Sequence, residues 1–249
     1  MSNKNRKVLV IAGEYPPLKT IGRIRTAKFV MHLRNLGWQP YVLTMEYSET
    51  SPLYSRALEE EIPEDVAVYR VANSSIDEAV FAFIKRILGR EKPRRDSIPV
   101  VQQQKQSHAK TEETQDLKQR LITGFKSLTR NWLHIPDDLI IWARRSYPVA
   151  LEIIEREKID LIYTSFPPFS SAITGYRLKR KTGLPWVVAS RDLWTDAVLR
   201  DWIPPLRQTW DAILARKLLG HAAALIPGSE QKTTYLQTLL PGHTARRCP

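Results

Sequence analysis

Apolar residues gather in six short runs along the chain, and helical patterns separate most of these runs. Each run is rich in β-branched or aromatic side chains and is bounded by Gly, Pro or polar residues. The runs are Lys7–Ala12, Tyr41–Met45, Ala67–Val71, Leu161–Ser165, Trp186–Ser190 and Ala223–Pro227. Their apolar character is continuous rather than alternating, which is typical of strands covered on both faces of a parallel sheet.

Five further segments place apolar residues on one helical face. They are residues 24–36, 139–156, 169–181, 206–219 and 230–240, and Gly37, Gly183 and Gly220 follow three of them as stop signals. Alternation of strands and helices predicts an α/β fold, a doubly wound, mainly parallel Rossmann-like sheet with right-handed crossovers. Six strands suit the order 3-2-1-4-5-6.

One stretch, residues 73–136, interrupts this alternation between the third and fourth strands. It carries no strand signal and contains the polar tract Gln102–Gln106. We interpret it as a basic helical insertion within a single domain spanning residues 1–249. The expected parts are amphipathic helices near Glu78–Leu88 and Asp116–Trp132 and a mobile basic linker at Arg90–Lys110.

The positive charge of the chain is concentrated in the same stretch. The sequence holds 38 Lys and Arg against 26 Asp and Glu, a net charge of +12. Residues 85–130 contain twelve basic and five acidic residues, which is more than half of the excess. Such charge favours binding to nucleic acid or to an anionic membrane surface. Because the segment carries no nucleic-acid-binding motif, we expect a solvated or lipid-facing arm and no nucleic-acid partner.

Cysteine content and hydropathy narrow the cellular compartments in which we expect the protein. Cys248 is the only cysteine, so no intramolecular disulfide can form. No apolar run approaches the length of about 18 residues that a membrane span needs. We expect a cytoplasmic chain without an integral anchor, peripheral to the inner face of the plasma membrane through its insertion.

Ligands of open parallel sheets bind beyond the carboxyl ends of the strands, so the segments after each strand are the candidate sites. After the first strand, the sequence lacks both the GxGxxG and the GxxxxGK[ST] phosphate-binding motifs. Gly22 allows close approach of a ligand to the backbone, and a helix start bearing Arg23 and Arg25 attracts phosphate or another anion. The alternative is a plain turn between strand and helix with solvated arginines.

Three later strand ends carry further candidates. Ser165 stands among hydroxyl and aromatic residues that suit a sugar or a lipid-linked acceptor, although the prolines there also fit a helix start with the rings in the core. Arg191 and Asp192 directly follow the fifth strand, where charged groups need partners or water. The alternative is an ion pair, Arg191–Asp192 or Arg191–Asp196, that caps the next helix. Ser229 and Glu230 begin the last helix. Helix capping is the first explanation for these two residues, and a binding site is the second.

Metal chemistry has no support in the sequence. The five histidines, His32, His108, His134, His221 and His243, show no spacing typical of metal ligands. We therefore expect no bound metal.

Taken in order, these segments resemble the N-terminal domain of GT-B glycosyltransferases, in particular the family 4-like group that builds bacterial surface polysaccharides. The matching segments are Val8–Ile11, Tyr15–Pro17, Ile21–Phe29, Leu36–Trp38, Val42–Thr44, Asp160–Ser165, Pro167–Pro168, Gly183–Val188, Arg191–Trp194 and Ala223–Glu230. The resemblance covers nearly the whole chain except the basic insertion, and the ordered set is more specific than any single motif.

The resemblance implies transfer of a sugar from a nucleotide-sugar co-substrate to an acceptor, often lipid-linked, without another cofactor. It implies that this domain mainly binds the acceptor and that Gly22–Arg25 face the cleft near donor phosphates or acceptor. Asp192 would orient the acceptor hydroxyl, with Arg191 as its electrostatic partner. Ser165, Ser229 and Glu230 would contact substrate. Lys19 and Thr20 stand where many relatives carry another glycine, which weakens the expectation of tight phosphate binding.

In the resembling family, a second domain binds the donor and supplies paired glutamates, whereas Glu230 is the only Glu after Arg200 in this chain. We expect a truncated product or half of a two-chain enzyme, with a separate donor-domain chain as partner and negligible transfer alone. The alternative is a catalytically silent, membrane-peripheral binding or scaffold module on the same fold.

Overall fold

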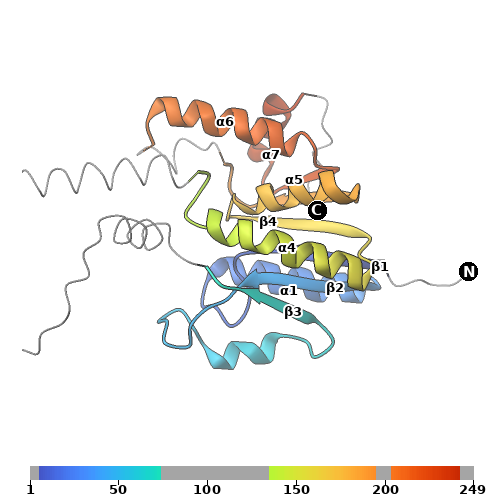
Figure 1. Cartoon of the computed structure of the whole chain (residues 1–249). Helices are drawn as coiled ribbons and strands as arrows, with labels where there is room; N and C mark the ends of the chain where they lie inside the picture. The colour runs from blue at the N-terminus through green and yellow to red at the C-terminus, as the bar shows by residue number, and fades with distance from the viewer. Residues whose placement is uncertain (1–5, 74–134, 195–202, 242–249) are drawn as a thin grey trace, which may run out of the picture.

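The six predicted strands form one parallel sheet at the centre of the molecule. A computed structural model of the chain describes residues 6–73, 135–194 and 203–241 (Figure 1). The strands are β1 (Arg6–Ile11), β2 (Trp38–Met45), β3 (Ala67–Val71), β4 (Leu161–Phe166), β5 (Trp186–Ser190) and β6 (Ala224–Pro227). Their order is β3-β2-β1-β4-β5-β6, so both the parallel sheet and the predicted order are confirmed.

Helices follow in the five predicted places. The described residues form α1 (Ile21–Asn35), α4 (Ile140–Glu157), α5 (Ser171–Thr182), α6 (Pro205–Leu219) and α7 (Glu230–Leu239). A short 3₁₀ helix, η1 (Arg56–Glu61), had no signal in the sequence. The helix α1 begins three residues earlier than predicted because the side chain of Thr20 caps it by accepting a hydrogen bond from the amide of Arg23. Gly22 therefore lies in the first turn of a helix and not in a loop.

Helices cover the two faces of the sheet unequally. Alternate residues of the strands point to opposite sides, so Leu9 and Ile11 pack with α4, α5 and α6, whereas Val8 and Val10 pack with α1. Figure 1 shows α4 and α5 in front of the sheet and α1 behind it. Helices on both faces confirm the doubly wound Rossmann-like architecture.

Two predicted helix stops depend on glycine. Gly37 and Gly183 have φ angles of 77° and 75°, in the left-handed region that side chains with a Cβ disfavour. Each glycine lies between a helix and the strand that follows it. Its left-handed conformation lets the chain reverse direction within a few residues. Gly220 also follows its helix, but its φ of −61° is right-handed, so it ends α6 without a left-handed turn.

The predicted insertion lies in the sequence between β3, an edge strand of the sheet, and α4. The helices predicted near residues 78–88 and 116–132, and the linker at 90–110, lie outside the described residues. No helix in the parts of the chain that the structure describes is both long enough and apolar enough to cross a membrane.

Candidate functional site

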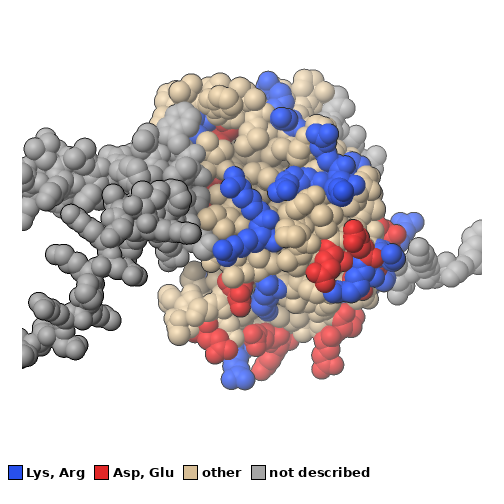
Figure 2. Space-filling model, in the orientation of Figure 1, with Lys and Arg blue, Asp and Glu red and all other residues tan. Residues whose placement is uncertain are grey.

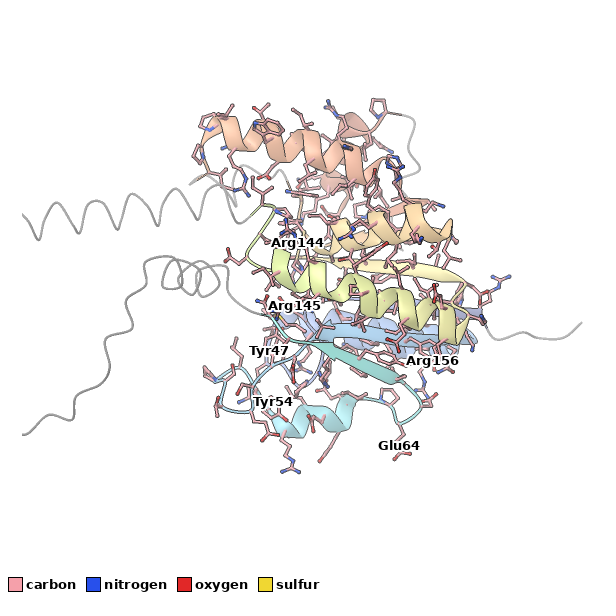
Figure 3. All side chains as sticks on the ribbon, in the orientation of Figure 1. Tyr47, Tyr54, Glu64, Arg144, Arg145 and Arg156 are labelled. Atoms are coloured by element: carbon pink, nitrogen blue, oxygen red, sulfur yellow. The ribbon has the colours of Figure 1, made fainter. Side chains whose placement is uncertain are left out.

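A cleft of about 340 Å³ lies beyond the carboxyl ends of β1, β2 and β4. Carboxyl groups, hydroxyls, prolines, leucines and two aromatic rings line it: Glu14, Leu18, Thr20, Tyr47, Leu53, Asp137, Asp138, Leu139, Pro167, Pro168 and Phe169. In Figure 3, Tyr47 lies at this end of the sheet, as do Arg144 and Arg145 in the first turns of α4. No Lys or Arg stands among these lining residues. Because carboxylates accept hydrogen bonds from hydroxyls and repel anions, the cleft suits a hydroxyl-rich ligand better than a phosphate.

Asp137 fixes the floor of this cleft by joining the starts of two helices. Its Oδ1 accepts hydrogen bonds from the amide of Leu139 at 3.1 Å and from the hydroxyl of Ser170, and its Oδ2 accepts one from the amide of Ser170 at 3.0 Å. Burial raises the pKa of Asp137 above its usual range, although the hydrogen bonds from Ser170 and Leu139 oppose the rise. The cleft therefore holds a carboxyl group that gains a proton more readily than one in water.

This raised pKa predicts a change in how stability depends on pH. In the pH range from the usual Asp value of 3.8 upward to the higher folded-state pKa, the folded protein binds more protons than the unfolded chain. The free energy of unfolding that Asp137 contributes should therefore fall as pH rises through this range. In Asp137→Asn, which cannot ionise, we expect a stability deficit at low pH that shrinks as pH rises, measured by urea denaturation at a series of pH values. A deficit that stays constant or grows would contradict the assignment, with Asp138→Asn, the exposed neighbour, as control.

A second cluster of charges lies at the ends of β5 and β6. The Nε of Arg191 donates to Oδ2 of Asp192 at 3.1 Å, and the Nζ of Lys232, from α7, lies 3.5 Å from Oδ1 of Asp192. Lys232 also donates to the backbone carbonyl of Arg191. The three side chains remain 26–35% exposed, so they are held together and still accessible to a ligand.

Gly22 joins this charge cluster to the cleft. A Cβ added at Gly22 would stand 2.0 Å from Oε2 of Glu14 and 2.7 Å from Nη1 of Arg191. The same Oε2 accepts a hydrogen bond from the hydroxyl of Thr20 at 2.7 Å. Gly22 thus leaves room for the ends of two charged side chains, whereas the sequence predicted approach of a ligand to its backbone. Glu14 contributes to both the cleft and the packing around Arg191.

The remaining predicted residues are placed in different ways. The guanidinium of Arg23 forms an ion pair with the carboxylate of Glu61 in η1, which is a contact within the fold. Within the described residues, Arg25 makes no hydrogen bond or ion pair. Ser229 caps α7, accepting from the amide of Lys232 at 3.4 Å, and the exposed Glu230 follows it in the first turn. The structure therefore brings Gly22, Arg191 and Asp192 together, with Ser229 at the start of the helix that supplies Lys232.

The loop after β4 combines both roles that the sequence allowed. Ser165 lies within β4 opposite Ala189 and is not among the residues that line the cleft. Phe166 is 2% exposed and belongs to the core, as the alternative interpretation expected. Phe169, however, lines the cleft and stacks on Trp194 with ring centroids 5.8 Å apart. Of the two phenylalanines in this loop, Phe166 is thus a core residue and Phe169 lines the cleft.

The Arg191–Asp192 ion pair of the alternative interpretation is present, and the next helix in the described residues, α6, begins at Pro205. Asp196, the other partner considered for Arg191, lies outside the described residues. The residues that sequence reasoning missed include Glu14, Tyr47, Asp137 and Lys232. Glu14 immediately follows the predicted first strand and its Gly13, so the strand-end rule that selected Arg191 could have found it.

Metal ligation has no geometry to support it in the described parts of the chain. Within those ranges, no three His, Cys, Asp or Glu side chains are grouped so as to hold a metal ion. The chemistry available is hydrogen bonding and electrostatic stabilisation by the acidic cleft and the Arg191–Asp192–Lys232 cluster.

Comparison with solved structures finds proteins that share this fold. A sucrose-phosphate synthase from Thermosynechococcus elongatus aligns with a TM-score of 0.58 at 12% identity, over 98% of this chain and 48% of that chain. A second structure bearing that protein's name aligns with a TM-score of 0.52 at 12% identity, over 98% and 88% of the two chains. The chain thus spans about half the length of the first of these relatives. At this identity the likeness shows the shared fold.

Comparison at the level of sequence identifies the family. Curated protein sequences give no significant match. Residues 115–247, more than half of the chain, match the family described as the glycosyl transferase 4-like domain. This match includes α4 to α7 and the Arg191–Asp192–Lys232 cluster. The chain therefore belongs to the glycosyl transferase 4-like domain family.

Proposed function

We propose that this chain is the acceptor-side domain of a glycosyltransferase that moves a sugar from a nucleotide-sugar donor to a hydroxyl of a lipid-linked or polysaccharide acceptor. The observation that carries the proposal is the cleft at the carboxyl edge of the sheet, with carboxylates and hydroxyls beside the ring of Phe169. Carboxylates accept hydrogen bonds from sugar hydroxyls, and an aromatic ring covers the apolar face of a sugar. The family match supports the same class of reaction.

In the proposed reaction, the acceptor oxygen bonds to the anomeric carbon of the donor sugar. The bond from that carbon to the phosphate oxygen breaks, the nucleoside diphosphate leaves with the bonding electrons, and the proton of the acceptor hydroxyl passes to an oxygen of the leaving phosphate. Asp192 orients the attacking hydroxyl, because Arg191 and Lys232 hold its two oxygens in one position. The cationic side chains of Arg191 and Lys232 favour the negative charge that develops on the leaving phosphate.

The donor site belongs to a second domain, and the proposed partner is a polypeptide segment that supplies it. Neither a metal nor another cofactor is part of the proposal. The cytoplasmic location and the contact of residues 85–130 with the inner face of an anionic membrane remain proposals that rest on the charge of that segment.

Asp192→Asn tests the proposed role of the charge cluster. We expect turnover to fall about 10²-fold, because the amide repels one of its two cationic neighbours and the acceptor hydroxyl loses its orientation. Turnover is measured with a co-expressed donor domain, as the transfer of labelled sugar from nucleotide-sugar donors to a lipid and polysaccharide extract. Glu155→Gln, an exposed carboxylate on α4, is the matched control.

Unchanged turnover in Asp192→Asn would remove this residue from the mechanism. If no donor domain supports transfer while the chain still binds glycans, the protein is a binding or scaffold module and the enzymatic proposal is wrong.

A further inference from the structure

A groove larger than the cleft lies on the α1 side of the sheet, between α1 and η1. Its volume is about 570 Å³. Four apolar and four charged side chains line this α1–η1 groove: Arg23, Ile24, Ala27, Lys28, Met31, Glu60, Glu61 and Pro63. None of these residues lines the cleft, so the groove is a separate surface of the protein.

Two ion pairs fix the walls of the α1–η1 groove relative to each other. The guanidinium of Arg23 pairs with the carboxylate of Glu61, and the Nε of Arg34 donates to Oδ2 of Asp65 at 2.9 Å. These contacts join α1 to η1 and to the loop before β3 at two separate places. The groove is therefore formed before any partner binds, which lowers the entropic cost of binding.

The α1 wall of the groove exposes apolar side chains that the core does not use. Ile24 and Met31 are 41% and 48% exposed, and they lie two turns apart on one helical face. Val30 and Leu33 form the core side of the same helix. Apolar residues that are grouped in a cavity, unlike ones scattered singly over a surface, indicate a surface that binds a partner.

The two walls carry opposite charges that have no ion-pair partner. Lys28 on α1 and Glu60 on η1 are both exposed, and neither forms an ion pair within the described residues. Figure 2 shows Asp and Glu side chains over the lower part of the molecule, where Figure 1 draws η1 in cyan, with Lys and Arg among them. Because an anionic lipid surface and a nucleic acid each present mainly negative charge, walls of opposite sign favour a protein partner.

We propose that the α1–η1 groove binds the same groove of a second copy of this chain, in a dimer whose two-fold axis runs along the groove. Such an axis places the α1 wall of each copy against the η1 wall of the other. Lys28 of each copy then meets Glu60 of the partner subunit, while Ile24 and Met31 of both copies meet near the axis, out of water. The groove is self-complementary, so a second copy pairs all four charges.

This arrangement places both clefts at one end of the dimer. Rotation about an axis parallel to α1 preserves the direction of α1, and this helix begins beside the cleft, which Thr20 lines. The interface covers neither cleft, and the proposal does not depend on sugar transfer.

Sedimentation equilibrium of the full chain tests the proposal. The parent should dimerise between low and high micromolar concentration. Lys28→Glu and Glu60→Lys should each weaken the dimer by about tenfold or more, because each variant brings like charges together twice. Mixing the two variants makes both pairs attractive again, so the dimer should return with one chain of each. The matched controls reverse exposed charges on the far side of the sheet, through Glu155→Lys on α4 and Lys181→Glu on α5, and should dimerise like the parent.

A second set of variants tests the apolar contact. Ile24→Ser with Met31→Ser should abolish the dimer, whereas Leu206→Ser with Ile213→Ser, which removes similarly exposed side chains from α6, should not. A parent that stays monomeric at high micromolar concentration would overturn the proposal, as would a mixture of the two charge variants that associates no more than either alone. So would a dimer that the α6 variant abolishes and the α1 variant keeps. Each outcome concerns association of the chains, and glycosyl transfer is assayed separately.

Discussion

Replacing Arg207 by Met is expected to lower the free energy of unfolding by about 3–5 kcal/mol. Arg207 and Asp211 lie one turn apart on α6, with side chains only 1% and 3% exposed. The Nε of Arg207 donates to Oδ2 of Asp211 at 3.1 Å, and its Nη2 donates to the carbonyl of Pro136 at 3.3 Å. Without the guanidinium, a carboxylate stays buried without its cation, and that desolvation is costly. Urea denaturation measures the loss.

The double variant Arg207→Met, Asp211→Leu is the control for this prediction. It removes both charges and replaces them with apolar side chains, so its stability should return to near that of the parent or exceed it. If the free energy of unfolding of Arg207→Met lies within about 1 kcal/mol of that of the parent, the ion pair is accessible to water and the prediction is wrong. A double variant as unstable as the single one would show that packing, and not the unpaired charge, causes the loss.

The second large effect is expected at Gly175, in the middle of α5. A Cβ there would stand 2.4 Å from Nε1 and 2.5 Å from Cε2 of Trp186. The indole is fully buried, and its Nε1 donates to the hydroxyl of Thr164 at 3.0 Å, so it cannot move aside. We expect Gly175→Ala to lower the free energy of unfolding by about 2–3 kcal/mol, even though Ala favours a helix over Gly by about 1 kcal/mol.

A double-mutant cycle with Trp186→Phe separates the clash from other effects. The phenyl ring lacks the Nε1 side of the indole, so Gly175→Ala should be less destabilising in the Trp186→Phe background than in the parent. Thermal and urea unfolding of all four proteins measure the coupling. Equal costs of Gly175→Ala in both backgrounds would mean that α5 shifts and that the indole does not limit the packing.

The central strands were predictable from sequence because most of their residues are buried on both faces. Val8 to Ile11 and Ile162 to Thr164 read as continuous apolar runs in the sequence, and the structure places them side by side at the centre of the sheet. Left-handed glycines at 37 and 183 mark helix ends for a local steric reason. The helix η1 was not predictable, because it is held by the packing of a loop against its surroundings and has no buried face.

The candidate site was only partly predictable because its contacts join distant parts of the chain. Arg191 and Asp192 could be found, since they directly follow a strand. Lys232 reaches Asp192 from a helix forty residues later, and nothing in the local sequence of α7 indicates this. Arg23 was predicted to bind anionic ligands, but its guanidinium donates a hydrogen bond to the carboxylate of Glu61 in η1. Partners of this kind are decided by tertiary packing and not by a motif.

The order of the strands also determines when the sheet can be completed during synthesis. The central strand β1 pairs with β4, and the amide of Lys7 donates to the carboxylate of Asp160 at 2.8 Å, across 153 residues of sequence. At a translation rate of about 5–20 residues per second, β1 waits roughly 8–30 s for this neighbour to leave the ribosome. During that interval β1 is an open edge of the half-sheet that it forms with β2 and β3, with apolar residues on both faces. The nascent chain is therefore most exposed to misassembly, and to capture by chaperones, before residue 160 emerges.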